Sequence, residues 1–378
     1  MFEALTHLQL QQYWWLIMSV VASGLVFLLF VQGGQTLIDT LGKNEVERTM
    51  VINSLGRKWE FTFTTLVLFA AGMFASFPLF YATSFGGAYY AWKIFLVCFV
   101  LQSVAFEFRR KKGNLLGQKT YEAFLYINGF LGVFILGAAV ATFFTGSDFY
   151  RSEYNLSYWQ TTSYGLEILL NPVNLSLGLA ILFLARILGA QYLTNNIQVD
   201  VIRQRARKQV LLNAIPFLVF FLYFLTRVLM MEGYAYDPET LVVFMEPNKY
   251  LNNFLQMPVV LVIFLAGVLL VLYGIGLNWF NHSIRGIWFS GPGTFLTVLA
   301  LFFILGYNNT SFYPSSHDLQ SSLTIQNASS SHYTLTAMSY ISLFVPVVVG
   351  YIFFAWKSID RTKIDAEDMK EGGDHHVY

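Results

Sequence analysis

Long apolar runs separated by short polar segments dominate the chain. We place nine such runs, at about 12–37, 61–84, 89–108, 122–145, 173–194, 211–231, 254–277, 293–310 and 335–357. Each approaches the roughly 20 apolar residues that a helix needs to cross the hydrocarbon core of a bilayer. Since backbone polar groups must be satisfied internally in lipid, the pattern predicts an all-α polytopic membrane protein with nine transmembrane helices.

Basic residues gather in alternate connecting segments. The segments after spans 1, 3, 5, 7 and 9 hold Lys43, Arg48, Arg57, Lys58, Arg109, Arg110, Lys111, Lys112, Lys119, Arg203, Arg205, Arg207, Lys208, Arg285, Lys357, Arg361, Lys363 and Lys370. The opposite segments and the N-terminus carry only Arg151 and Lys249. The positive-inside rule therefore predicts a multi-pass membrane protein with its N-terminus outside and its C-terminus in the cytoplasm.

Composition supports this class. Hydrophobic residues make up 56% of the chain and charged residues 12%, against about 25% charged in soluble domains. The net charge of +1 gives no sign of a nucleic-acid partner, and one cysteine, Cys98, allows neither a disulfide framework nor a cysteine-rich metal site. The N-terminus has Glu3 but no basic residue before the first run, unlike a secretory signal, so we expect that helix to be retained.

Two short segments indicate an internal repeat. GGQTLIDT (33–40) ends span 1 and GAQYLTNN (189–196) ends span 5, with Gln35 and Gln191 at an offset of 156 residues. Because four spans separate them, both halves have the same orientation. We predict two four-helix bundles in a pseudo-twofold parallel repeat (1–165 and 166–320), followed by the ninth helix and a tail (321–378). The polar segments 146–166 and 311–334 are predicted to cap the outer face, and the tail ending EGGDHHVY to be disordered.

Haem ligation needs axial side chains inside a helical bundle. All six histidines (His7, His282, His317, His332, His375 and His376) fall in termini or loops of the predicted spans. Methionines within the spans are more typical of packing than of ligation. We therefore predict that this chain binds no haem. The His375–His376 pair is read as part of a solvated tail rather than as a metal site.

Three ionisable residues within or beside the spans remain as site candidates, because burying charge in a membrane is costly. Glu60 and Glu107 lie at the cytoplasmic ends of spans 2 and 3, and Arg186 lies near the middle of span 5. Each acid is either an interfacial charge offset by surface cations such as Lys58 and Arg109 or a carrier that takes protons from the cytoplasm. For Arg186 a structural ion pair, with a residue of this chain or another, is favoured.

Four segments resemble subunit II of the cytochrome bd quinol oxidases. They are GKNEVERTMVINSLGRKWEFT (42–62), FASFPLFYATSFGGAYYA (74–91), VAFEFRRK (104–111) and SSLTIQNASSSHYTLTAMSYISLFVPVVVGYIFFAWK (321–357). The resemblance implies a nine-helix subunit that pairs with a homologous subunit I, which holds haems b and d, oxidises quinol and reduces oxygen to water. It also implies a proton path lined by the acid after the Trp, here Glu60 where Asp is commoner. Glu107 is a weaker candidate for that path. A small single-helix subunit, and a quinone held structurally in this chain, are left open.

The chain departs from the family pattern at two places. An acidic D-G-F-D-type motif ends helix 1 in the family, where this chain has Gln32-Gly33-Gly34-Gln35. The family's Arg before Pro-Val in helix 3 is matched by Gln102-Ser103-Val104. Losing two acids and one cation together is consistent with the compensated loss of a buried ion pair.

We therefore predict that the chain is subunit II of a cytochrome bd-type quinol oxidase of a bacterial cytoplasmic membrane. It is expected to support the haem subunit, to contribute to proton delivery and to contact lipid and quinol. A secondary transporter built on the parallel repeat is the alternative. Transporters of that kind usually break helices at matching places in both halves, whereas Pro78 and Pro216 are unmatched. A purely structural scaffold is a third interpretation. A neighbouring gene for a haem-ligating membrane subunit would favour the oxidase.

Overall fold

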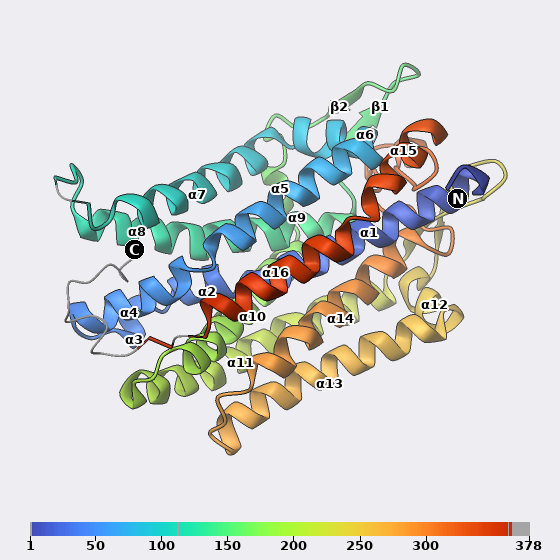
Figure 1. Ribbon diagram of the computed structural model, residues 1–378. Coiled ribbons are helices and arrows are strands. Elements are labelled where there is room, and N and C mark those ends of the chain that lie inside the picture. Colours follow the sequence, from blue (N-terminus) through green and yellow to red (C-terminus); the bar gives the residue numbers. More distant parts are fainter. Residues whose placement is uncertain (1, 112, 362, 365–378) are drawn as a thin grey trace.

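The computed structural model describes residues 2–111, 113–361 and 363–364, and long helices form most of it (Figure 1). Nine spans among these residues are long and apolar enough to cross a membrane, which confirms the predicted fold class. They are His7–Gln35 (α1, His7–Leu28, and α2, Phe30–Gln35), Glu45–Ser76 (α4, Glu45–Gly56, and α5, Trp59–Ser76), Tyr89–Phe108 (α7), Gln118–Thr145 (α8, Gln118–Ile127, a π-helical turn η3, Asn128–Gly132, and α9, Val133–Thr145), Pro172–Asn196 (α10), Asp200–Met230 (α11), Pro258–Phe280 (α13), Ile287–Gly306 (α14) and His332–Ile359 (α15, His332–Ser342, and α16, Val345–Ile359).

Two spans begin well before their apolar runs. The second begins at Glu45 and not near 61, and the sixth begins at Asp200 and not near 211. Asn44 caps the earlier start by accepting a hydrogen bond from the backbone N–H of Glu47. Arg203, expected in a connecting loop with the other basic residues up to 208, therefore lies on the first turns of α11. Charged residues with good helix propensity continue a helix beyond its apolar part.

The spans run side by side along one axis (Figure 1). One end, called here the basic end, holds α3 (Ile38–Leu41), α4, the start of α8 and the start of α11. The opposite end holds α6 (Pro78–Phe80), α12 (Lys249–Gln256) and the hairpins β1–β2 (Phe149–Arg151, Ser157–Trp159) and β3–β4 (Gly233–Tyr236, Val243–Glu246). Segments 146–166 and 311–334 meet there through a bridge between Ser147 and Ser315. The tail 365–378 lies outside the described residues.

The helix α10 lies at the centre of the fold, with 72% of its apolar window buried. It meets α2 through glycines: a Cβ on Gly33 would lie 1.9 Å from the Ala185 carbonyl oxygen, and one on Gly189 would lie 2.7 Å from that of Phe30. Only residues without a side chain allow two helices to approach so closely. These glycines belong to the two segments compared above, but the twofold repeat itself stays a prediction.

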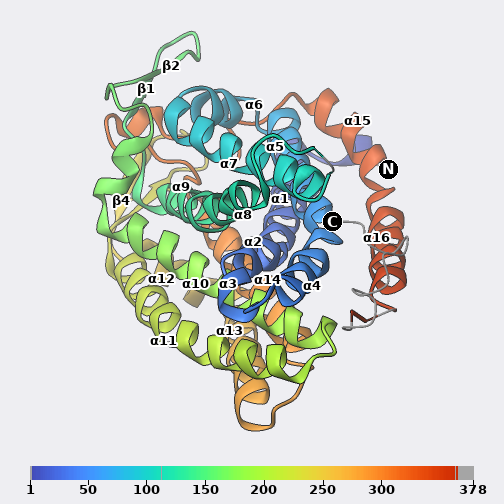
Figure 2. The same ribbon diagram turned by 90° about the vertical axis from the view of Figure 1, so that its left-hand side faces the viewer.

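The ninth span is the most exposed, with 11% of its window buried. In the view along the helices α16 stands at the edge, beside rather than within the bundle (Figure 2). The preceding α15 is hydrogen-bonded to α1, because Trp14 Nε1 donates to Leu335 O (3.2 Å) and to Ser339 Oγ (3.0 Å). Large apolar side chains on α16, such as Val347 and Phe353, remain exposed.

Candidate functional site

Buried amide side chains form a polar centre in the first half of the protein. Gln32 on α2 and Gln102 on α7 are both fully buried, and Gln32 Nε2 donates to Gln102 Oε1 at 3.1 Å. These are the two places where the chain departs from the family's acid and arginine. The contact supports the interpretation that a neutral amide pair has replaced an ion pair. It also identifies Gln32, the first of the two glutamines, as the partner of Gln102.

Other amides in the same region have no hydrogen-bond partner among the described residues. Gln35 (α2), Asn53 (α4), Asn128 (η3) and Gln191 (α10) are fully buried, and neither amide atom of any of them is paired. Leaving such a group unsatisfied costs about 1–3 kcal/mol, so buried polar groups are normally bound to protein or ordered water. The arrangement is therefore suited to holding water or another polar group inside the membrane-spanning part.

Irregular backbone coincides with these amides. The first span breaks at Leu29, after which every residue of α2 is buried. The turn η3 begins at Asn128, and π-helical turns occur frequently at functional sites. A Cβ on Gly129 in that turn would lie 2.5 Å from the backbone oxygen of Gln32, so α2 and η3 touch through their backbones.

Arg186 lies beside this centre on α10 with neutral partners. Its Nε donates to Asn213 Oδ1 at 2.6 Å, its Nη1 donates to Thr36 Oγ1 at 2.7 Å, and its guanidinium lies 5.4 Å from the ring centroid of Phe130. In the part of the chain that the structure describes, no carboxylate lies within 4.0 Å of it. An ion pair with a residue of another chain stays a prediction.

Glu60 and Glu107 lie on adjacent helices at the basic end. Glu60 is the second residue of α5 and is exposed, with no hydrogen bond or ion pair to another described residue. Glu107 is also exposed, and its carboxylate lies 3.9 Å from Lys111 Nζ. The residues before them, Trp59 and Phe106, stack at 6.0 Å with an interplanar angle of 16°. The structure thus places both acids beside one aromatic pair, on the outer surface of the chain.

Lys58 and Arg109 were expected as surface cations, and this expectation is wrong, because both side chains are buried. Lys58 Nζ lies 3.2 Å from Asp360 Oδ1 and 4.4 Å from the ring centroid of Trp356. Asp360 Oδ1 also accepts hydrogen bonds from Tyr192 (3.4 Å) and from the amide of Asn196 (3.2 Å). The Lys58–Asp360 ion pair therefore connects the end of the ninth span to the start of α5.

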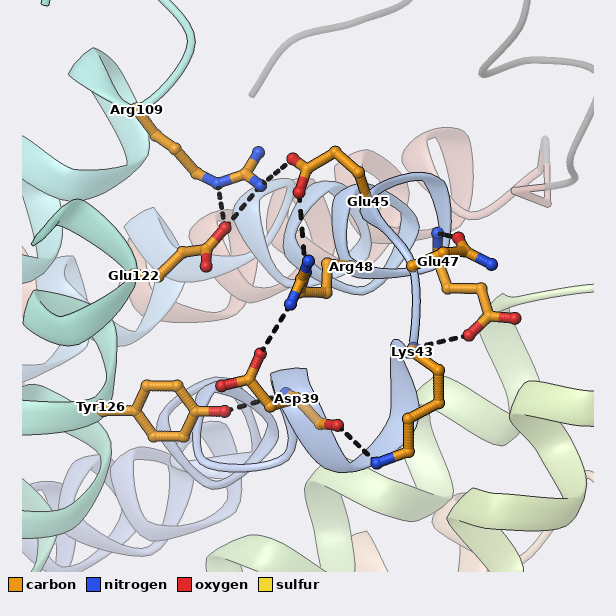
Figure 3. A network of polar contacts seen from close by, with 9 residues as sticks. Asp39, Lys43, Glu45, Glu47, Arg48, Arg109, Glu122 and Tyr126 are labelled. Atoms are coloured by element: carbon orange, nitrogen blue, oxygen red, sulfur yellow. Dashed lines mark hydrogen bonds and ion pairs between the residues drawn. The ribbon is translucent and has the colours of Figure 1, made fainter. Parts of the chain in front are cut away.

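Arg109 is the centre of an ion network at the basic end (Figure 3). Its side chain is 1% exposed; Nε and Nη2 donate to Glu122 Oε1 at 2.9 and 2.6 Å, and Nη2 donates to Glu45 Oε1 at 2.7 Å. Arg48 links the other oxygen of Glu45 (3.6 Å) to Asp39 Oδ1 (3.4 Å). Sequence reasoning missed this network, although the Glu-Val-Glu-Arg segment that supplies Glu45 and Arg48 was visible as a family motif.

The histidines of the described residues lie at helix starts and in connections. His7 and His332 begin α1 and α15 at the end opposite the basic end, where each Nε2 lies 3.0 Å from a backbone carbonyl oxygen. His282 and His317 lie in connections, and His375 and His376 lie outside the described residues. No group of three or more His, Cys, Asp or Glu in the described part could hold a metal ion. This donor set does not fit axial ligation of a haem within the bundle.

An apolar cavity of about 70 Å³ lies among α1, α5, α9, α10 and α14. Its lining includes Leu66, Phe143, Leu177 and Val298. Small-molecule sites usually measure about 300–1,000 Å³ and include a few polar groups. The cavity is therefore too small and too apolar for a quinone head group, and a structural quinone in this chain stays a prediction.

Fold and site together define a multi-pass membrane protein whose polar centre lies inside a bundle of nine candidate spans. The chain belongs to the family described as cytochrome bd terminal oxidase subunit II, whose sequence model matches residues 10–359. It is 28% identical to cytochrome bd-I ubiquinol oxidase subunit 2 of Escherichia coli (strain K12), over 97% of each chain. It is 26% identical to the probable cytochrome oxidase subunit 2 of Haemophilus influenzae, over 92% of this chain and 93% of that one.

A solved structure shares the fold. The bd oxidase from Geobacillus thermodenitrificans matches with a TM-score of 0.64 and 15% identity, over 93% of this chain and 98% of the matched chain. These comparisons confirm the family resemblance and favour the oxidase subunit over the transporter.

Proposed function

We propose that this chain is the haem-free subunit of a cytochrome bd-type quinol:oxygen oxidoreductase. It pairs with a haem-bearing subunit I, supports the fold of that subunit and contributes to proton delivery. Family membership supports the pairing, and the relative in Escherichia coli is named a ubiquinol oxidase subunit. The exposed apolar residues of α5 and α7, such as Leu68, Phe74 and Leu96, offer a surface that a partner helix can cover.

The orientation and the energetics belong to the same proposal. The N-terminus lies outside and the basic end faces the cytoplasm. Protons consumed at oxygen enter from that side, so that turnover generates a membrane potential. A small single-helix subunit could bind without changing this scheme.

The observation that carries the proton role is the position of Glu60. It lies at the basic end on the exposed face of α5, and no described residue forms a hydrogen bond or an ion pair with its carboxylate. A carboxylate can accept and release a proton, which the amides of Gln32 and Gln35 cannot do. Glu60 is therefore the group placed to pass protons from solution toward a subunit that covers this face. Glu107 is a second, weaker candidate at the same level.

The test is oxygen consumption by the purified complex with excess quinol, normalised to haem. Glu60→Gln should slow turnover about 100-fold, as expected when a positioned acid–base group is lost, while leaving assembly and haem content intact. Glu60→Asp should retain most of the activity. Asp200→Asn removes another exposed acid at the same end and serves as the matched control. Unchanged turnover in Glu60→Gln would leave Glu60 as an interfacial charge, and loss of haem would make it an assembly residue.

The haem assignment has its own test. Replacing His7 and His332 together with Ala should leave the visible spectrum and the haem content of the complex unchanged, because both rings lie at helix starts, where their Nε2 atoms contact backbone carbonyl oxygens and, for His7, also the Gln11 amide. Loss of one haem per complex in this variant would place a ligand in this chain.

A further inference from the structure

A long groove separates α16 from the rest of the protein. It has a volume of about 950 Å³, and its walls include Phe27 of α1, Trp288 of α14, and Val349 and Phe353 of α16. The helix that forms its outer wall is the one that stands at the edge of the bundle in Figure 2. Apolar surface of this extent, open along one side, is typical of a binding site for an extended apolar molecule.

The groove is amphipathic along its length. Its apolar walls end at the basic end in three cations, Lys357, Arg361 and Lys363. Asp360 also lines that end, but the buried Lys58 balances its charge at 3.2 Å. Neither Lys357 nor Arg361 pairs with an acid among the described residues, so this end of the groove carries a net positive charge.

The length of the groove matches one half of a bilayer. The lining residues Val349 and Ser358 are nine helical positions apart, which corresponds to about 14 Å along α16. The hydrocarbon core is roughly 30 Å thick, so one leaflet contributes about the same length. Trp288 is half exposed on the opposite wall, and tryptophan is enriched where acyl chains meet head groups.

We propose that this groove binds one anionic glycerophospholipid from the leaflet at the basic end. Its phosphate lies between Lys357 and Arg361, and an acyl chain runs along Phe27, Val349 and Phe353. Cationic side chains at a membrane surface attract anionic lipids, and a guanidinium matches phosphate geometry well. The bound lipid fills the space behind α16 and so holds the ninth span at a fixed distance from α1 and α14.

The chemistry of the groove favours a lipid over a protein helix or a quinone. A helix of another subunit would meet apolar walls but would leave the cations without a counter-charge. A quinone is neutral and gains nothing from them. An anionic lipid satisfies both ends of the groove at once.

The experiment uses the complete oxidase complex, delipidated in detergent and examined by native mass spectrometry after addition of phosphatidylglycerol, phosphatidylethanolamine or ubiquinone. Each Lys or Arg near an anionic lipid contributes roughly fivefold in affinity, so Lys357→Gln with Arg361→Gln should weaken phosphatidylglycerol binding about 25-fold. Val349→Trp, which obstructs the apolar part of the groove, should also weaken it. Arg110→Gln with Lys208→Gln removes the same charge from the same end outside the groove and should leave this binding unchanged.

Four results would overturn the proposal. The first is equal phosphatidylglycerol binding by the wild type and by the Lys357→Gln/Arg361→Gln variant when both assemble. The second is equally tight binding of phosphatidylethanolamine, which lacks the net negative charge. The third is loss of ubiquinone rather than phosphatidylglycerol in Val349→Trp. The fourth is a cross-link from a cysteine at Val349 to another subunit, which would show that protein fills the groove. Because subunit composition is read from the same spectra, failure of assembly is separated from failure of lipid binding.

Discussion

Replacing Gln32 with Glu should destabilise the protein unless Gln102 is replaced with Arg in the same chain. The wild-type side chains share one hydrogen bond of 3.1 Å at full burial, and Gln32 Oε1 and Gln102 Nε2 remain unpaired. Glutamate has the shape of glutamine, so Gln32→Glu introduces a charge without changing the packing. Gln102→Arg introduces the opposite charge at the other end of the contact.

The expected magnitudes follow from the burial of both positions. An uncompensated buried charge costs about 3–5 kcal/mol, whereas a buried pair with good geometry is close to neutral relative to uncharged side chains. Each single variant should therefore lose about 3–5 kcal/mol of stability. The double variant should lose little, so that most of the summed loss of the two single changes is recovered as coupling between the two contacting side chains.

The assay is thermal unfolding of the purified complex, followed by tryptophan fluorescence at one fixed scan rate because membrane complexes unfold irreversibly. At about 2 °C per kcal/mol for a chain of this size, each single change should lower the apparent Tm by about 6–10 °C, and the double change should restore most of it. Gln191→Glu with Gln102→Arg is the matched control, since Gln191 is equally buried and does not contact Gln102. Additive losses in the Gln32→Glu/Gln102→Arg variant would refute the inference that this amide pair replaces an ion pair.

Three further changes test the packing. Arg109→Met should lower the apparent Tm by about 6–10 °C, because it leaves the largely buried carboxylate of Glu122 without its cation and removes one partner of the half-exposed Glu45; an unchanged Tm would show that the network contributes nothing. Asp360→Asn should destabilise the complex by about 3–5 kcal/mol, since Lys58 stays buried without a counter-charge, and limited proteolysis should then cut sooner near the end of the ninth span. Gly33→Ala should prevent normal assembly, because its Cβ would overlap α10, whereas Gly24→Ala meets nothing within 4 Å and should assemble at wild-type levels.

The number and approximate positions of the spans could be predicted because a bilayer imposes length and apolarity on each helix. The true starts at Glu45 and Asp200 could not, because hydropathy reports where a helix enters lipid and not where its hydrogen bonding begins. Asn44 was available as a capping signal for the earlier start, and the Arg- and Lys-rich stretch after Asp200 has high helix propensity.

The candidate site was partly visible in the sequence. The paired departures at Gln32 and Gln102 indicated that these positions interact, although 70 residues separate them and only the fold shows the contact. The burial of Lys58 was not foreseeable, because its counter-charge Asp360 lies 302 residues away, in a segment interpreted as the beginning of a tail. Local sequence identifies which side chains are charged, whereas long-range packing decides which of them are buried.

The neutral centre makes the proposed role of Glu60 testable against relatives. Gln32 and Gln35 can hold water but cannot store a proton, whereas the acids usual in the family at these positions can. On the proposal above, Glu60, exposed at the basic end, exchanges protons along that route in this chain. Converting it to Gln should therefore slow turnover more here than the equivalent change does in a relative that keeps both acids, when both oxidases are assayed with the same quinol. Equal slowing in the two enzymes would show that the acids of helix 1 do not share this route, and the neutral centre would then have no part in proton delivery.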